Sequence, residues 1–335
     1  HGIEGLKERS RAPIHLANRM PDWIETCILD VKHQYPYWGS KKILNWLMQE
    51  RNEVNWPAKS TIDDLLKRKG LVRPAKRKRR LVSYNKPFIL CENPNDSWSI
   101  DYKGQFILGN KEICYPLTIT DNFSRYLFAV EGMRKISGIS TKEVLTNLFI
   151  EFGMPLAIRS DNGSPFAGNG LAGLSKLSVW LLKLGITPER IRKGHPEENG
   201  RHERMHLTLK KETAMPPKQT QIEQQQCFES FKKMFNEERP HEGIEFQRPT
   251  WLYRSSERKF PKKLHSIKYD SSFPEIRKIR TNGTMKWKGK EIFVSETLIG
   301  ERVALKPYSE DEWLLHFTSM PIGLFSEKTC KVLKI

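Results

Sequence analysis

The sequence predicts a multidomain α/β protein with an N-terminal helix-turn-helix unit, a mixed α/β core and a C-terminal small β-barrel. Apolar residues recur at helical spacing near the N-terminus, strand-like and helix-like segments alternate in the middle, and short strand patterns follow toward the C-terminus. A length of 335 residues suits two or three domains. We expect a helical domain at 1–72, a basic linker at 73–89, the core at 90–250, a second basic linker at 251–274 and the barrel at 275–335.

The chain is strongly basic, with 57 Lys and Arg residues against 39 Asp and Glu and a net charge of +18. The excess lies in two stretches: residues 67–89 carry ten basic and no acidic side chains, and residues 254–290 carry twelve against three. The core is nearly neutral, with 21 basic against 20 acidic side chains at 90–250. A polyanion such as nucleic acid is therefore the expected partner, although a basic run is also typical of a solvated linker.

Composition excludes other classes of protein. No apolar run approaches the ~18 residues that a membrane helix needs, so we expect no integral membrane protein. The five cysteines are scattered and never form a Cys-x-x-Cys pair, which argues against a disulfide framework or zinc site and suits a reducing compartment. Because the chain begins at His1 instead of Met, we expect it to be trimmed at its N-terminus.

The first 72 residues contain three helix patterns. Their apolar faces are Ile24, Cys27, Ile28 and Val31; Ile43, Trp46 and Leu47; and Ile62, Leu65 and Leu66. Pro21 opens the first helix, Ser40 is the expected N-cap of the second, and Gly70 ends the third. Such helices suit a helix-turn-helix whose last helix enters the DNA major groove, although any three-helix bundle has the same periodicity. The outward face of that last helix would carry Lys59, Ser60, Asp63 and Lys67.

The middle of the chain predicts a layered α/β domain with a mixed sheet. The expected elements are strands at 98–102, 112–120, 124–130 and 156–160 and helices at 140–152, 174–184 and 201–212. Ser140 and Glu143 are spaced as a capping box, and Gly153 and Gly185 are expected to end two of the helices.

Three acidic residues in this domain are candidates for chemistry. Asp is depleted in strands, so Asp101 in the middle of the first strand needs a reason. Asp161 follows a strand in an Asp-Asn-Gly sequence that is also a good turn signal, and Glu203 lies on a helix, where solvated carboxylates are common. Together they would form an oxygen-only site that suits Mg²⁺ or Mn²⁺. Two such ions can activate an attacking oxygen and stabilise the leaving oxygen of a phosphodiester.

The C-terminal segment reads as a basic β module. Asn282-Gly283 is a tight-hairpin signal, and the sequence after it alternates from Trp287 to Val294. Further short strands at 303–305, 313–317 and 330–333 predict a small barrel. Trp287 between Lys286 and Lys288 favours a DNA-docking role, while the alternative is a stabilising appendage.

The motifs of the core resemble a known family. Trp98–Asp101, Ser160–Gly163, His195–Arg204 and Phe235–His241 together resemble the integrase core of insertion-sequence transposases, which belong to the DDE superfamily with the retroviral integrases. The resemblance extends over nearly the whole chain. It implies a ribonuclease-H-like core in which Asp101, Asp161 and Glu203 bind two Mg²⁺ ions, which Mn²⁺ can replace. It also implies hydrolysis at transposon ends and joining of the freed 3′-hydroxyls to target DNA.

The resemblance also implies partners and a location. We expect double-stranded DNA as partner, both as transposon ends and as target, a homo-oligomer assembled on that DNA, and no membrane. We expect a cytoplasmic, nucleoid-associated bacterial protein. The expected DNA-binding residues are Lys59, Ser60, Lys67, Arg73, Lys76, Arg77, Lys78, Arg79, Arg80, Lys210, Lys286 and Lys288.

Spacing alone leaves two candidates for the third acid, Glu197 and Glu203. Glu197 has the spacing from Asp161 that is commoner in the family, with 35 intervening residues against 41 for Glu203. We prefer Glu203 because it follows Asn199-Gly200 as in the family pattern, and helical spacing places Leu207, as a packing anchor, and Lys210 on its face.

Histidines cluster near this acid, at His195, His202 and His206. His202 and His206 have the spacing of a zinc pair, but without a third ligand we favour a role in positioning phosphate or water.

Two other functions compete with a transposase. One is a domesticated, catalytically idle DNA-binding protein, against which the intact Asp101, Asp161 and Glu203 argue. The other is a metal-dependent nuclease that cuts without joining.

Overall fold

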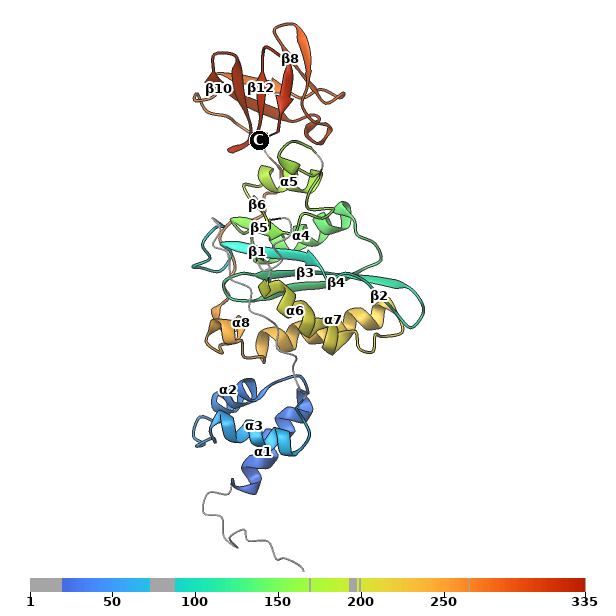
Figure 1. Ribbon diagram of the computed structural model, residues 1–335, viewed down its shortest axis with the longest axis vertical. Coiled ribbons are helices and arrows are strands. Elements are labelled where there is room, and N and C mark those ends of the chain that lie inside the picture. The colour runs from blue at the N-terminus through green and yellow to red at the C-terminus, as the bar shows by residue number, and fades with distance from the viewer. Residues whose placement is uncertain are drawn as a thin grey trace, which may run out of the picture. The chain divides into compact units, whose positions relative to one another are not determined.

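The computed structural model describes residues 20–72, 88–168, 170–192, 198, 200–264 and 266–334 (Figure 1). The chain divides into two compact units, residues 1–77 and 78–335, and each is described by itself. Within the described part of the chain, no helix is both long and apolar enough to cross a bilayer.

The N-terminal unit is helical, with its apolar faces close to those expected. Its helices are α1 (Asp22–Gln34), α2 (Ser40–Glu50) and α3 (Lys59–Arg68). Their buried residues include Ile24, Ile28 and Val31; Ile43 and Leu47; and Ile62, Leu65 and Leu66. Helix α3 ends before Gly70, whose φ of 69° suits glycine. Ser40 is the first residue of α2 and not its N-cap, which is Gly39, because the buried Ser40 hydroxyl bonds the Asp63 carboxylate instead.

A mixed sheet forms the centre of the second unit. Its strands are β1 (Ser97–Tyr102), β2 (Phe106–Ile107), β3 (Ile113–Asp121), β4 (Leu127–Met133), β5 (Ala157–Ser160) and β6 (Thr187–Arg190). Strands β4, β3, β1, β5 and β6 are neighbours in that order, and the short β2 pairs with the start of β3. Strand β3 runs antiparallel to both of its neighbours, β1 and β4, whereas β5 and β6 run parallel to β1. This topology is that of a ribonuclease-H-like core.

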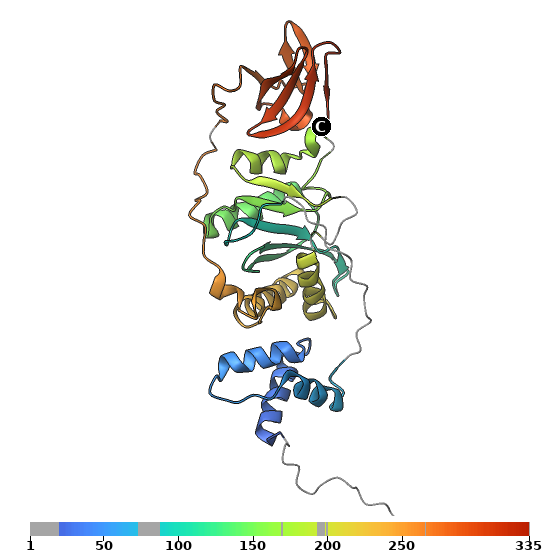
Figure 2. The ribbon, with the colours of Figure 1, turned by 60° about the vertical axis from the view of Figure 1, so that its left-hand side comes forward.

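Helices cover both faces of the sheet (Figures 1 and 2). They are α4 (Gly138–Phe152), α5 (Lys176–Lys183), α6 (Gly200–Thr213), α7 (Gln221–Glu237) and α8 (Pro249–Leu252), with 3₁₀ turns η2 (Leu171–Gly173) and η4 (Glu242–Ile244). On one face, Trp98 of β1 packs in a cluster with Phe149 of α4 and Trp180 of α5. On the other face, Leu127 of β4 belongs to a cluster with residues of α6 and α7, such as Phe228. The sheet therefore lies between two helical layers.

The helix boundaries differ from the predictions in one informative place. Helix α4 begins at Gly138 with Ser137 as N-cap, so the predicted capping box at Ser140 lies inside the helix. A true capping box occurs instead at Thr220 of α7, whose hydroxyl accepts from the Glu223 amide. Gly153 ends α4, as expected, with a φ of 79°.

The C-terminal strands form an open sheet, so the predicted closed barrel is not what the pairing shows. Strands β13 (Lys331–Leu333), β12 (Met320–Ser326), β11 (Glu312–Phe317), β10 (Arg302–Ser309) and β7 (Glu275–Lys278) pair in that order. A separate hairpin joins β8 (Thr284–Trp287) to β9 (Lys290–Phe293), and a 3₁₀ turn η5 (Glu296–Leu298) follows. The cluster buried between sheet and hairpin includes Met285, Trp287, Leu315 and Phe325.

The hairpin turn lies at Lys288-Gly289 and not at the predicted Asn282-Gly283. Both turn residues have positive φ, 46° and 83°, as a two-residue hairpin turn of the type I′ class requires. Gly283 also forms a turn, donating its amide to the Arg280 carbonyl at 2.9 Å, but that turn precedes the hairpin.

Part of the predicted second linker packs on the core. Tyr253 is buried in the main core cluster, and the Ser256 amide donates to the Phe152 carbonyl at 2.8 Å. Arg258 donates to the carbonyls of Leu184 and Gly185 at 3.2 and 2.9 Å. Residues 253–258 therefore belong structurally to the core.

Candidate active site

Strand β1 divides its side chains between the two faces of the sheet. Trp98 and Ile100 are buried against α4 and α5, whereas Ser97, Ser99 and Asp101 point to the opposite face. The Asp101 side chain is 20% exposed. An acid thus lies on the polar side of a strand whose other side forms the main core.

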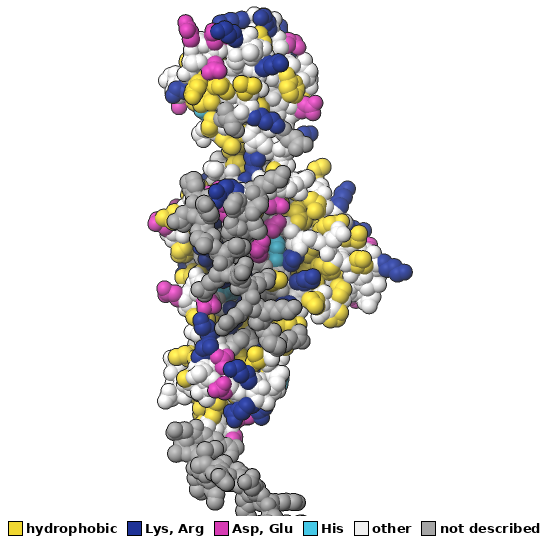
Figure 3. Space-filling model, in the orientation of Figure 1, with side chains coloured by type: hydrophobic (Ala, Val, Ile, Leu, Met, Phe, Trp, Pro, Cys, Tyr) yellow, Lys and Arg dark blue, Asp and Glu magenta, His cyan; other side chains and the backbone are white. Residues whose placement is uncertain are grey.

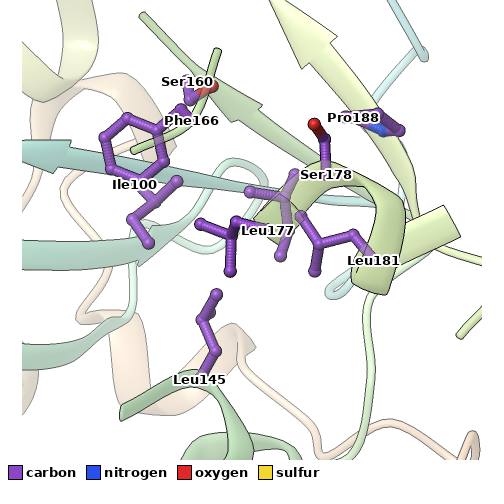
Figure 4. A pocket seen from close by; sticks show the side chains of 9 residues that line it. Ile100, Leu145, Ser160, Phe166, Leu177, Ser178, Leu181 and Pro188 are labelled. Atoms are coloured by element: carbon purple, nitrogen blue, oxygen red, sulfur yellow. The ribbon is translucent and has the colours of Figure 1, made fainter. Parts of the chain in front are cut away.

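The apolar side beneath Asp101 is closely packed. Figure 4 shows Ile100 facing Leu145 of α4 and Leu177 of α5. They line a cavity of about 10 Å³, which is no larger than a single water needs. The cavity is therefore too small for a ligand. The opposite face of β1, which carries Asp101, is the candidate for chemistry.

Asp161 follows β5, the parallel neighbour of β1. The register aligns Ser99 with Arg159, so Asp101 and Asp161 both lie two residues further along adjacent strands. The Asp161 carboxylate accepts a hydrogen bond from the Gly163 amide at 3.0 Å. The predicted Asp-Asn-Gly turn therefore forms, and the same Asp161 side chain remains a candidate metal ligand. A Cβ on Gly163 would lie 2.9 Å from Asp161 Oδ2, which explains the glycine.

Glu203 lies in the first turn of α6 and is exposed. The helix buries its opposite side through His202, Met205, His206 and Leu209. Leu207, which we expected to anchor the Glu203 face by packing, is 53% exposed, so that expectation is wrong: the helix meets the sheet on the His202 side.

Two buried histidines join α6 to the sheet. Thr118 Oγ1 lies 2.7 Å from His202 Nε2 and 2.6 Å from His206 Nε2, and Thr120 Oγ1 lies 3.1 Å from His202 Nδ1. Burial lowers the pKa of His202 to about 3 and that of His206 to about 2, so both rings are neutral. His202, only 2% exposed, cannot position phosphate or attacking water at the surface. His195 lies outside the described residues.

The surroundings of Asp101 disfavour its ionised form. The pKa of Asp101 rises from 3.8 to about 7, first because of burial and then because of the neighbouring Asp161, with Glu203 contributing less. His206 Nδ1 lies 3.8 Å from Asp101 Oδ2, but as a neutral ring it does not compensate the carboxylate. A hard cation bound by these oxygens would relieve the repulsion.

Asp101, Asp161 and Glu203 offer only carboxylate oxygens, the donor type that Mg²⁺ or Mn²⁺ prefers. Among the residues that the structure describes, no three His, Cys, Asp or Glu side chains are close enough together to hold a metal ion. Within the same residues, His202 and His206 have no third side chain beside them that would complete a zinc site. Glu197, the alternative third acid, lies outside the described residues.

The predicted DNA-binding residues have varied surroundings. Lys59, Ser60 and Lys67 are exposed on α3, but Lys59 pairs with Asp63 and Lys67 with Asp64 at 3.6 Å. Lys210 is exposed on α6. Arg73, Lys76, Arg77, Lys78, Arg79 and Arg80 lie outside the described residues.

Of the three C-terminal residues that suggested DNA binding, Trp287 is buried and Lys288 is paired with an acid. Trp287 is 5% exposed within the module's core, so it cannot stack on a base. Lys286 is exposed, whereas Lys288 pairs with Glu327 at 2.6 Å. On the face shown in Figure 3, Lys and Arg side chains of this module are interspersed with acidic ones.

Several residues of the polar face escaped the sequence analysis. Arg159 and Glu189 form a buried ion pair, with Arg159 Nη2 2.9 Å from Glu189 Oε2 and side chains only 10% and 7% exposed. Glu189 also accepts the Ile89 amide at 2.6 Å, and the Phe88 ring stacks on the Arg159 guanidinium at 4.0 Å. Arg159 and Glu189 lie on β5 and β6, and the sequence of each short strand does not identify its partner on the other.

The chain is similar to integrase core domains and to proteins of bacterial insertion elements. Two family models described as "Integrase core domain" match residues 92–196 and 184–249. The chain is 23% identical over 226 residues to an uncharacterized 31.7 kDa protein of insertion element IS407 from Burkholderia multivorans, covering 67% of this chain and 78% of the relative. It is 26% identical over 171 residues to an uncharacterized 39.2 kDa protein of insertion element IS476 from Xanthomonas euvesicatoria, covering 51% and 47%.

A solved structure also resembles the core. The HTLV-2 integrase catalytic core domain, solved in complex with magnesium, is similar with a TM-score of 0.35 and 16% identity. It covers 48% of this chain and 97% of that domain.

Proposed function

We propose that this chain, matched by the family models described as "Integrase core domain", is a transposase of the DDE superfamily that acts on double-stranded DNA. It binds transposon ends, hydrolyses phosphodiester bonds there and joins the freed 3′-hydroxyl ends to target DNA. The observation that carries the proposal is Asp101, a mid-strand acid with its pKa raised to about 7 by burial and by Asp161. Such perturbed acids cluster at functional sites.

We propose Asp101, Asp161 and Glu203 as the ligands of two Mg²⁺ ions, which Mn²⁺ can replace. Bound there, the ions would supply positive charge to the attacking oxygen and to the leaving oxygen of the phosphodiester. Within the chain, Thr118 donates to the Asp101 carbonyl at 3.1 Å and thereby fixes the strand that carries the acid. His206 packs beside Asp101 as a neutral ring, so it leaves the Asp101 carboxylate available to a metal ion.

DNA binding outside the active site is assigned to the basic segments. In this proposal α3 serves as the recognition helix of a helix-turn-helix, and the tract at 73–80 follows the phosphate backbone onward. Lys210 and Lys286, both exposed, would add phosphate contacts. Since two transposon ends must be handled together, we propose a homo-oligomer on DNA.

Strand joining with labelled transposon ends and Mg²⁺ tests the proposal. The inverted repeats that flank the gene would supply the end sequence. We expect Asp161→Asn to bind these ends like the wild type and to lose joining, because only the carboxylate charge is removed. Asp311→Asn, an exposed acid of the C-terminal module, is the matched control and should join normally. Equal joining by Asp161→Asn and the wild type would contradict the proposal.

The same assay separates the remaining alternatives. Products that are cut but never joined would indicate a nuclease, and end binding without cutting by the wild type would indicate an idle DNA-binding protein. Comparing Glu203→Gln with Glu197→Gln decides the third acid: we expect only Glu203→Gln to abolish joining.

A further inference from the structure

Two arginines, Arg125 and Arg201, meet on the polar side of the core. Arg125 follows β3, and Arg201 is the second residue of α6. Both guanidiniums donate to one backbone oxygen, the carbonyl of Asn122, Arg201 at 3.3 Å and Arg125 by a shorter contact. Segments 76 residues apart in the sequence therefore direct two positive charges at the same point.

Within the described part of the chain, the structure gives neither arginine a carboxylate within ion-pair distance. Asp121, the acid beside Arg125, is 1% exposed, and its oxygens already accept the Asn95 amide at 2.8 Å and the Ser124 amide at 2.7 Å. Two like charges sharing one neutral acceptor repel each other, and an anion bound between them would remove that repulsion.

Asn122, whose carbonyl accepts from both arginines, is held against β1, the strand that carries Asp101. The Asn122 side chain is 4% exposed, accepts the Ser99 hydroxyl at 2.7 Å and donates to the Ser97 hydroxyl at 3.2 Å. Ser99 lies two residues before Asp101, which is about 7 Å along a β-strand. Arg201 likewise lies two residues before Glu203, at the positive end of the α6 helix dipole.

We propose that Arg125 and Arg201 form a phosphate-binding subsite that holds a backbone phosphate of the DNA beside the reacting one. Its ligand is a phosphate diester, held by two guanidiniums and the N-terminus of α6. Its role is to position the strand so that the reacting phosphodiester lies against Asp101 and Asp161. The inference rests on the proposed function for the identity of the ligand as DNA.

Salt dependence of DNA binding tests the subsite without requiring catalysis. Binding of a fluorescent random-sequence duplex to the full chain is measured over a range of salt concentrations in EDTA. Each phosphate contact contributes about 0.9 to the slope of log K against log salt concentration. We expect Arg125→Gln and Arg201→Gln each to reduce the slope by about that amount. Arg134→Gln, the same change at an arginine 73% exposed beyond β4, should leave it unchanged.

Two further measurements keep the result specific. Arg201→Lys retains the charge and should keep the wild-type slope; if it loses as much as Arg201→Gln, the effect is structural and the proposal fails. Inorganic phosphate, followed by the thermal unfolding of the wild type and Arg201→Gln, distinguishes the ligand. Stabilisation by free phosphate that depends on Arg201, combined with unchanged DNA slopes, would overturn the DNA assignment. Unchanged slopes in both Gln variants, without such stabilisation by phosphate, would overturn the subsite.

The experiments distinguish a wrong phosphate subsite from a wrong proposed function. The duplex assay in EDTA reports binding alone, whereas Asp161→Asn reports joining. A chain that joins ends normally but shows no slope change in Arg125→Gln would retain its function and lose only this subsite.

Discussion

Replacing Asp101 by Asn should stabilise the folded core at pH 8 while abolishing strand joining. The acid lies in a half-buried position where its pKa rises from 3.8 to about 7, chiefly because burial disfavours the charged form and secondly because Asp161 repels it. Asn keeps the shape of the side chain but carries no charge. The substitution therefore removes an electrostatic cost that only function explains.

The size of the gain follows from the shift. A rise of roughly three pKa units at about 1.4 kcal/mol each corresponds to about 4 kcal/mol when the carboxyl is ionised in both states. Because the Asp101 side chain is 20% exposed, solvent screening reduces this figure, and we expect about 2–4 kcal/mol.

The gain must depend on pH in a definite direction. Below about pH 4 the carboxyl is protonated in the folded and unfolded chain alike, so Asp101 costs nothing. Between about pH 4 and 7 the unfolded chain ionises while the folded one holds its proton, so the stability of the wild type falls as pH rises. Above pH 7 the full cost applies. The advantage of Asp101→Asn should therefore be near its maximum at pH 8 and much smaller at pH 4.

Urea unfolding of both proteins at pH 4, 6 and 8 in EDTA measures this difference. Asp311→Asn, at an acid 52% exposed, should change stability by no more than about 0.5 kcal/mol at any pH. Added Mg²⁺ should stabilise the wild type more than Asp101→Asn, because the ion binds the folded carboxylates. A destabilised Asp101→Asn, or a gain that does not vary with pH, would refute the electrostatic account of the site.

Three further changes test the core, the C-terminal module and the basic tract. Glu189→Gln leaves the buried Arg159 guanidinium without its charge partner and should cost about 3–5 kcal/mol in urea unfolding, and a loss under 1 kcal/mol would contradict the pairing. Trp287→Ala should lower stability by about 3–5 kcal/mol because the ring is buried, whereas Phe293→Ala, 58% exposed in the same hairpin, should cost far less. Replacing the five basic residues of Lys76–Arg80 by Gln should weaken DNA binding and flatten its salt dependence without changing the unfolding transition; an unchanged slope would refute their phosphate contacts.

Local patterns predicted most helices and strands but failed where side chains had tertiary partners. The spacing of Ile62, Leu65 and Leu66 correctly predicted α3 because helical periodicity is a property of the local chain. Ser40 and Ser140 were assigned as N-terminal capping residues from local preference alone. The N-caps are Gly39 and Ser137, which lie one and three residues earlier.

Trp287 illustrates the same limit for function. Flanking lysines suggested a surface ring for DNA, yet the ring closes the core of the hairpin and sheet. Sequence neighbours on a strand point to opposite faces, so Lys286 can be exposed while Trp287 is buried. Exposure is decided by which sheet face meets the core.

The sequence by itself determined the identities of the candidate acids and the layered α/β class, because a mid-strand Asp and alternating periodicities are visible without coordinates. Only the tertiary structure decided how those acids interact. Pairing of β1 with β5 aligns the strands of Asp101 and Asp161, and burial beside α6 raises the pKa of Asp101. It also brought Arg125 and Arg201 to one carbonyl, across 76 residues of sequence. Such convergence depends on strand order and register, which are long-range properties that no local pattern encodes.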